Sequence, residues 1–462
     1  MKRSVTENVA GRREFIRRAA SLSVAGVAAP WALNLAAIGD AAAQSVGDYK
    51  ALVCLFLVGG NDNGNTVIPY DTTTHAAYAA VRGGLALPRS GLAGTLLQPS
   101  TALSGGRQYA LAPGLAPLIP IFDAGRLGVL MNVGPLIQPT TKAQYLARSV
   151  PLPPKLFSHN DQQSTWQACN PEGATSGWGG RIGDLFAADN AGSTFACIST
   201  GGTSVFVSGL SAVQYQLNST GPVGINGIGA NLFGSSAASQ ALRTLVTSTT
   251  GPSLLEREHA KLVERSITAT TSVSAALTAA PALTTAFPAT GIGRQLNMVA
   301  RMLSARGSLN VKRQVFFVTL TGFDTHDTML ADHAALMTEL GDGLAAFDAA
   351  LTELAIQDRV TTFTASDFGR TLTSNGDGSD HGWGSHHFVM GGAVRGQRIH
   401  GTPPVPANDG VDDIGQGRYL PTTSVDQLGA TLATWFGVSA SNLPLVIPNI
   451  GNYTVKDLGL FT

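Results

Sequence analysis

The sequence predicts an α/β fold with a largely parallel central sheet flanked by helices. Short, continuously apolar segments recur along its 462 residues, and such segments are typical of strands that are buried on both faces. Longer segments lie between them and carry apolar residues at three- and four-residue steps, which is the pattern of amphipathic helices. Strands that alternate with helices favour parallel pairing through crossover connections.

The predicted strands follow in chain order. The first is an apolar run that ends at Gly59 and Gly60. The segments predicted as strands are 51–58, 127–133, 315–320, 360–365 and the shorter 388–390. Because these runs are apolar throughout, we expect helices to cover both faces of the sheet.

Three helices are predicted around these strands. The longest spans 330–356, where apolar residues such as Leu336 and Leu340 recur about one turn apart. A shorter helix is expected over 115–122 and another around 428–435.

The stretch from residue 200 to residue 310 differs from the rest of the chain. Its first half is rich in Gly, Ser and Thr, and its second half has a mainly helical pattern broken by prolines. We interpret residues 200–310 as a cap subdomain inserted between strands of the main sheet. A set of long surface loops is the alternative interpretation.

Composition excludes several classes of protein. Apolar residues make up 44%, which is ample for a core and excludes a wholly disordered chain. Charged residues make up only 13%, and 30 basic residues balance 30 acidic ones. Because no basic tract is longer than a few residues, no nucleic-acid partner is expected.

Residues 1–43 are predicted to be a twin-arginine export signal. Arg12 and Arg13 precede an uncharged stretch, and a small-residue cleavage pattern ends just before Gln44. The mature chain, 44–462, would leave the cytoplasm folded through the twin-arginine translocase and would be periplasmic or secreted. An uncleaved membrane anchor is the alternative, but we expect no stable membrane span after cleavage.

Acidic residues and histidines gather where predicted strands end. Because ligand sites of parallel α/β sheets lie beyond the carboxyl ends of the strands, these side chains are expected to converge. In chain order, the candidates are Asn61, Asp62, Asp324, His326, Asp367, Arg370, Asp380, His381, His386 and His387. Carboxylates and imidazoles at one point leave buried charge unless a cation neutralises them, so we predict a divalent metal: Zn, Mn, Mg or Ca.

The same residues also have structural interpretations. Asn61 and Asp62 could make Asx turns, and Asp324 and His326 could cap the following helix. Asp367 and Arg370 could form an ion pair. Some of the residues in the segment 380–387 must be ordinary loop residues, because four ligands in eight positions would be excessive.

A further polar segment starts at Ser158 and is predicted to open a helix. A hydroxyl at a helix N-terminus is well placed to bind or attack an anion, which makes Ser158 a candidate nucleophile with His159 beside it. The alternative is that Ser158 or Asn160 is an ordinary N-cap.

The chain resembles an exported bacterial family of unknown function, the domain-of-unknown-function family fifteen-oh-one. The matching motifs span nearly the whole mature chain in order. Besides the twin-arginine start, they are 59–66, 158–162, 322–326, 366–371 and 380–384. This family is usually grouped with the alkaline phosphatase and sulfatase superfamily, so the resemblance implies an alkaline-phosphatase-like α/β core with metal ligands at strand ends.

The resemblance also implies roles for the candidate residues. In superfamily order, the matches are Asp62, the nucleophile Ser158, Asp324 with His326, Asp367, and His381 or His387 with Asp380 nearby. Phe368 stands where the superfamily has a histidine. The implied activity is metal-dependent hydrolysis of a small phosphate or sulfate ester, and the alternative is a non-catalytic exported binding or assembly protein that keeps this fold.

Overall fold

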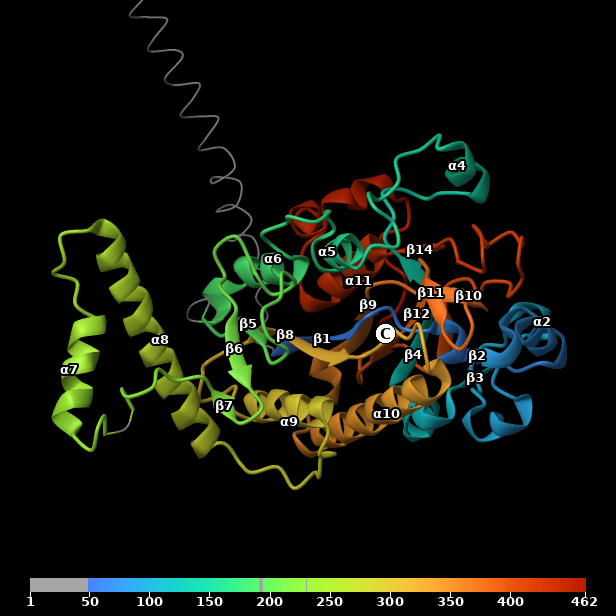
Figure 1. Ribbon diagram of the computed structural model, residues 1–462. Coiled ribbons are helices and arrows are strands. Elements are labelled where there is room, and N and C mark those ends of the chain that lie inside the picture. The colour runs from blue at the N-terminus through green and yellow to red at the C-terminus, as the bar shows by residue number, and fades with distance from the viewer. Residues whose placement is uncertain (1–48, 191–193, 230) are drawn as a thin grey trace, which may run out of the picture.

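The computed structural model of the chain describes residues 49–190, 194–229 and 231–462, so the predicted export signal lies outside the described residues. Its centre is a sheet of ten strands with helices on both faces (Figure 1). The predicted α/β class and the largely parallel sheet are therefore confirmed.

The middle of the sheet is formed by three parallel strands. β1 (Lys50–Val58) lies between β8 (Arg313–Thr321) and β9 (Val360–Ser366), with Ala51 opposite Gln314 on one side and Val360 on the other. Beyond β8 the sheet continues with β5 (Cys197–Ser199), β6 (Tyr215–Asn218) and the antiparallel β7 (Gly221–Pro222). Each of the three central strands matches a predicted one.

On the other side of β9 the strand direction changes. β12 (Ser385–Met390) runs antiparallel to both β9 and β4 (Leu127–Gly134). β13 (Arg398–His400) and β14 (Thr423–Ser424) then pair with β4 in parallel. The fifth predicted strand is thus present, but it is longer than 388–390 and is the antiparallel member among its neighbours.

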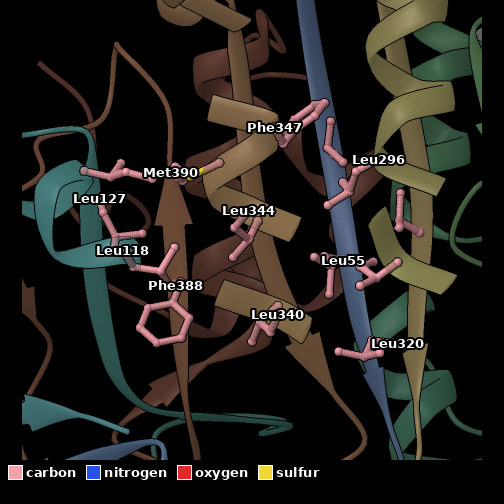
Figure 2. Packing of buried hydrophobic residues seen from close by; sticks show 14 of the residues in the cluster. Leu55, Leu118, Leu127, Leu296, Leu320, Leu340, Leu344, Phe347, Phe388 and Met390 are labelled. Atoms are coloured by element: carbon pink, nitrogen blue, oxygen red, sulfur yellow. The ribbon is translucent and has the colours of Figure 1, made fainter. Parts of the chain in front are cut away.

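Alternate residues of β1 point into two separate hydrophobic clusters, one on each face. Leu55 faces α9 (Gly291–Ser304) and α10 (Met329–Glu353), where Leu296, Leu344 and other side chains pack against it (Figure 2). The neighbouring β1 residues face α6 (Trp178–Leu185) and α11 (Val425–Phe436) on the opposite side. Both faces of the sheet are buried, as the apolar strands predict.

The remaining elements surround this core. They are β2 (Val67–Pro69), β3 (Tyr109–Leu111), β10 (Arg370–Ser374), β11 (Ser379–His381), α2 (Thr72–Arg82), α3 (Ile119–Asp123), α4 (Lys142–Ala147), α5 (His159–Ala168), α7 (Ser236–Val246), α8 (Leu254–Ala279) and α12 (Leu443–Val446). Where one helix is predicted over 115–122, a 3-10 turn over Pro113–Leu118 precedes α3. Prolines in this stretch lack the N–H group that a continuous α-helix requires.

The segment predicted as a cap divides into two parts. α7 and α8 stand off from one end of the sheet, whereas α9 packs into the main core against α10 and β8 (Figure 1). Within the described ranges, no helix combines the length and the apolar character needed to cross a membrane. Cys54, Cys169 and Cys197 are buried and free.

Candidate metal centre

Four segments meet beyond the carboxyl ends of the central strands. Asp324 follows β8, Asp367 follows β9, His159 is the first residue of α5, and His381 ends β11. The turn after β1 contributes Gly59, which has a φ of +117°. A Cβ atom at this position would collide with the backbone nitrogen of Asp324, so glycine is what allows the β1 and β8 loops to approach.

The centre of the cluster is formed by His159, Asp324 and His381. Each of the three offers one ligand atom, and these atoms all lie within 4.8 Å of one another. The Nε2 atom of His159 lies 3.4 Å from one carboxylate oxygen of Asp324, and the Nε2 atom of His381 lies 3.1 Å from the other oxygen. These three side chains come from three different parts of the fold and meet at one point.

His326 approaches the same carboxylate from the side. Its Nε2 atom lies 3.1 Å from an Asp324 oxygen and 3.0 Å from the Nε2 atom of His381. Its Nδ1 atom lies 3.4 Å from a carboxylate oxygen of Asp380. His326 is therefore placed to add a third nitrogen to the cluster, and Asp380 lies at the rim.

The other ring nitrogen of each central histidine has a partner that fixes the orientation of the ring. The Nδ1 atom of His159 lies 2.6 Å from Asp367, and the Nδ1 atom of His381 lies 2.8 Å from the carbonyl oxygen of Phe157. A carbonyl oxygen can only accept, so His381 must donate from Nδ1. In the neutral ring the Nε2 atom then carries a lone pair that points at Asp324, as in histidines that bind metals.

This arrangement fits a divalent cation. Burial lowers the pKa of His381 below its usual value, which favours the neutral ring. A lone pair and a carboxylate oxygen at this distance repel each other unless a positive charge lies between them. Ligands in a tetrahedral zinc site stand about 3.3–3.5 Å apart, which follows from metal–ligand distances of about 2.0–2.2 Å. The two distances between the imidazole nitrogens and the Asp324 oxygens, 3.4 Å and 3.1 Å, are close to those values.

Arg370 holds Asp324 in place. Its guanidinium is fully buried and donates to an Asp324 oxygen at 2.9 Å, to the carbonyl oxygen of Gly59 at 3.1 Å and to the carbonyl oxygen of Ser379. Burial raises the pKa of Asp324, but the hydrogen bond and charge of Arg370 outweigh it and leave this pKa below its usual value. The carboxylate is therefore ionised, and Arg370 acts on it rather than on an incoming anion.

Asp367 orients His159, and both of its carboxylate oxygens accept hydrogen bonds from other groups of the protein. One of its oxygens accepts from the backbone N–H of Gly59 at 3.1 Å, and the other accepts from His159 and, at 2.8 Å, from Gln163. The hydrogen bond that His159 donates to Asp367 raises the pKa of His159 above its usual value. Asp367, a predicted metal ligand, thus contacts the Nδ1 atom of His159, on the side of the ring that faces away from Asp324 and His381.

Asp62, a predicted ligand, lies outside this cluster. It forms a buried ion pair with Arg82 at 2.7 Å and caps a short turn by accepting from the backbone N–H of Asn65 at 2.9 Å. Burial raises the pKa of Asp62, but the charge of Arg82 outweighs it and holds the pKa below its usual value. The neighbouring Asn61 bonds to Thr66. The turn interpretation describes Asp62, whereas the side chain of Asn61 bonds to the hydroxyl of Thr66 and lies 3.0 Å from the Nε2 atom of His333.

Two other candidate positions also point away from the cluster. His387 is buried in β12, where its Nδ1 atom lies 3.3 Å from the hydroxyl of Thr364 and its ring packs on Trp166. His386 accepts at Nδ1 from the backbone N–H of Asn132 at 3.1 Å. Adjacent strand residues point to opposite faces, and neither face of β12 places a histidine at the cluster.

Ser158 lies at the start of α5, immediately before His159. Its side chain makes no cap bond to the helix and instead donates to a carboxylate oxygen of Asp161 at 3.0 Å. The predicted nucleophile thus adjoins the cluster in sequence and has an acidic partner of its own.

Two contributors to the site are not among the predicted site residues. Phe368 packs its ring on His159 and His381, with centroid distances of 4.9 Å and 4.5 Å, so an apolar ring borders both histidines. Phe157 orients His381 through its backbone and adopts a left-handed φ of 72°. Backbone groups and strained bulky residues of this kind carry no compositional signature.

The fold and the cluster define an α/β protein with a histidine–carboxylate centre at the ends of its central strands. The chain belongs to the family described as Protein of unknown function (DUF1501), whose model matches residues 49–443. A comparison with curated proteins finds no match.

Several solved structures resemble the chain at low identity. A sulfatase from Pseudoalteromonas sp. is 9% identical, with 93% of this chain and 76% of that one covered and a TM-score of 0.36. The C-terminal periplasmic domain of EcEptC from Escherichia coli, in complex with Zn, is 9% identical, with 87% of each chain covered and a TM-score of 0.35. The lipoteichoic acid synthase LtaP from Listeria monocytogenes is 9% identical, with 87% and 76% covered and a TM-score of 0.32. Similarity of this degree is too distant to indicate function.

Proposed function

We propose that this chain is an exported metal-dependent hydrolase of phosphate or sulfate esters, with its metal centre at His159, Asp324 and His381. The observation that carries the proposal is the meeting of two imidazole Nε2 atoms with the two oxygens of one carboxylate, at 3.4 Å and 3.1 Å. The export motif and the superfamily resemblance of the sequence support the same reading.

The centre is open to solvent on one side and rigid on the other. The side chains of Asp324 and His326 are 45% and 41% exposed, so a small ester can reach them. Behind them, the buried Asp367 and Arg370 hold the central residues in position. When bound, a divalent ion at such a site polarises an ester oxygen and lowers the pKa of a coordinated water.

Within this proposal, Ser158 is the nucleophile. Its hydroxyl donates to the buried carboxylate of Asp161, and its neighbour His159 belongs to the metal centre. Ser158 also stands at the N-terminal end of α5, where the helix dipole favours an anionic group.

A second function is favoured by a different observation. Nine large apolar side chains that are strongly exposed lie between residues 210 and 262 of the described chain. Surfaces of this kind mark interaction sites in many proteins. A binding or assembly protein that keeps this fold without turnover would account for them.

The deciding experiment measures metal content, thermal melting and ester hydrolysis. The exported chain is expected to contain about one divalent ion, to lose melting temperature on chelation, and to hydrolyse an aryl phosphate or an aryl sulfate. Asp324→Ala removes the shared carboxylate, so it should lose most of the metal, the hydrolysis and the response to chelator. Asp327→Ala is the matched control, because it removes an exposed carboxylate of the same loop.

Two outcomes would count against the hydrolase. If wild type and Asp324→Ala both lack metal and melt alike with and without chelator, the metal centre is absent. If metal binds at Asp324 but neither ester is hydrolysed at any metal tested, the binding or assembly function is the better account.

A further inference from the structure

A pocket opens beside the first turns of α10, and none of the residues that line it belongs to the metal centre. Its volume is about 250 Å³, and its other walls come mainly from the turn after α2 and from the loop that follows β3. His333 and Met337 are the buried residues that α10 contributes, whereas Leu330 is 41% exposed at the rim. A cavity of about 150 Å³ can hold a benzene ring, so this pocket has room for one substituted ring.

The lining of the pocket is mostly apolar. Its apolar residues are Leu87, Ala112, Pro113, Leu330, Ala334 and Met337. Among the residues that the structure describes, no aspartate, glutamate, lysine or arginine lines it. Because a charge that leaves water without a partner is costly, this lining favours a neutral ligand.

Two of the polar side chains in the lining already have partners in the protein. The side-chain amide of Asn65 donates to the carbonyl oxygen of Leu85 at 2.9 Å and accepts from the hydroxyl of Tyr78 at 2.6 Å. The hydroxyl of Thr338 donates to the carbonyl oxygen of Ala334 at 3.0 Å. Neither side chain therefore needs a ligand to satisfy it.

His333 is different, because one of its ring nitrogens is unpaired. The residue is only 3% exposed, and its Nε2 atom lies 3.0 Å from the Oδ1 atom of Asn61. An amide oxygen can only accept, so Nε2 must donate. Burial lowers the pKa of His333 to about 4, so the ring is neutral and Nδ1 carries a lone pair. Within the described residues this Nδ1 atom has no hydrogen-bond partner.

We propose that this pocket binds a small neutral molecule with a hydroxyl group on one apolar ring, a phenol in the simplest case, whose hydroxyl donates to the Nδ1 atom of His333. Such a ligand pairs the free acceptor with a donor and places its ring against the apolar lining. Met337 can adjust to the shape of the ring, because its side chain is unbranched and flexible. The proposal does not depend on metal binding or on hydrolysis at the strand ends.

The test is a calorimetric titration of the whole chain with phenol and with toluene, which replaces the hydroxyl by a methyl group. Phenol should bind with a Kd in the millimolar range or below, and about fivefold more tightly than toluene because only phenol can donate to Nδ1. His333→Leu removes the acceptor and keeps an apolar side chain of similar size. In this variant toluene should bind more tightly than phenol.

A second variant blocks the pocket without changing His333. Ala334 is exposed and lines the pocket, so Ala334→Trp should fill it and abolish the binding of both rings. The matched control is Ala335→Trp, because Ala335 is exposed on the same helix but does not line the pocket. It should leave both affinities unchanged, and melting temperatures check that every variant is folded.

Three results would overturn the proposal. The first is a wild-type chain that binds no phenol at several millimolar, which would mean that water alone meets His333. The second is an Ala334→Trp variant that binds phenol as tightly as wild type does, because phenol would then bind elsewhere. The third is a folded His333→Leu variant that still prefers phenol to toluene.

Discussion

At Asp62, a buried carboxylate meets a buried guanidinium. The side chains of Arg82 and Asp62 are 0% and 1% exposed and lie 2.7 Å apart. Arg82 also donates to the carbonyl oxygen of Thr371 at 3.0 Å, so the pair joins α2 to β10. At Asp324, a carboxylate that follows a strand of the same sheet meets imidazoles and stays half-exposed. The neighbours of each carboxylate therefore set its role.

Asp62→Asn should destabilise the protein without removing the metal. The substitution keeps the shape of the side chain but leaves the charge of Arg82 buried without its partner, which costs about 3–5 kcal/mol of unfolding free energy. Chemical denaturation and metal analysis of the same samples check this. Asp71→Asn is the control, because Asp71 caps α2 and accepts from the backbone N–H of Gln108 without a buried cationic partner, and asparagine caps helices about as well as aspartate, so little unfolding free energy should be lost. Loss of metal with unchanged stability would instead make Asp62 a ligand, as the superfamily pattern predicts.

The difference between these two aspartates could not be read from the sequence. Both follow a strand of the same sheet, and the positions of Asp324 and His326 follow from that topology, whereas His381 ends a strand of the separate β10–β11 sheet. The partner of Asp62 is Arg82, which lies twenty residues later on a helix. The pattern of apolar residues does not show that the side chain of this arginine points towards Asp62. Residue types and strand ends predict a region, whereas ion pairs between side chains decide which acids remain available.

At the scale of elements, the site depends on the contact between α5 and the end of β9. His159 and Gln163 lie one turn apart on α5, and both donate to the same oxygen of Asp367. The other oxygen of Asp367 accepts from Gly59 after β1. One carboxylate thus connects a helix and two strands, and it sets the direction of the His159 ring.

Asp367→Asn should lower metal affinity while the fold persists. An amide cannot accept from Gly59, His159 and Gln163 together, so His159 loses its fixed orientation. The loss of such a partner typically costs 10–100-fold in metal affinity, which a titration of apoprotein with Zn²⁺ would measure. Asp161→Asn is the control, since Asp161 lies on the same helix but bonds to Ser158. Equal affinities for wild type and Asp367→Asn would show that Asp367 does not support the centre.

Element types were easier to predict than their directions. The apolar runs of β1, β8 and β9 and the periodicity of α10 are long enough to indicate strand or helix without ambiguity. The run that predicts β12 covers only three residues, and a run of apolar residues does not say whether it pairs in parallel. The direction of β12 depends on the path of the chain after β9, where the chain turns back at residues 375–378 before it enters β12. This path is set by tertiary packing.

At the scale of the whole molecule, three histidines are buried within the protein body as neutral rings. Burial lowers the pKa of His333 and His386 to about 4 and that of His387 to about 3. In the unfolded chain the same rings titrate near their usual value of about 6.5. Burial also acts on Asp426, whose pKa is raised to about 6, so this carboxyl opposes the histidines.

Stability should therefore fall steeply as the pH drops from about 6.5 towards 4. In this window the unfolded chain binds protons at three histidines that the folded rings resist, and this stability is fully present only above the unfolded pKa. The folded chain keeps one proton on Asp426 that the unfolded chain releases, and this contribution runs in the opposite direction. Near pH 5 the difference is roughly two protons, or roughly 3 kcal/mol of unfolding free energy per pH unit.

Denaturation curves at several pH values measure this slope of the unfolding free energy. The variant His387→Asn tests whether the buried histidines cause it. The Nε2 atom of His387 has no hydrogen-bond partner in its buried position, so its loss removes a proton-binding group while Asn can still meet Thr364. The slope near pH 5 should fall by about one proton. Leu146→Asn, at an exposed position on α4 that binds no proton, should leave the slope unchanged. A wild-type slope near zero would mean that water reaches these rings in the folded state, because only access to solvent would bring their pKa values back to the unfolded ones.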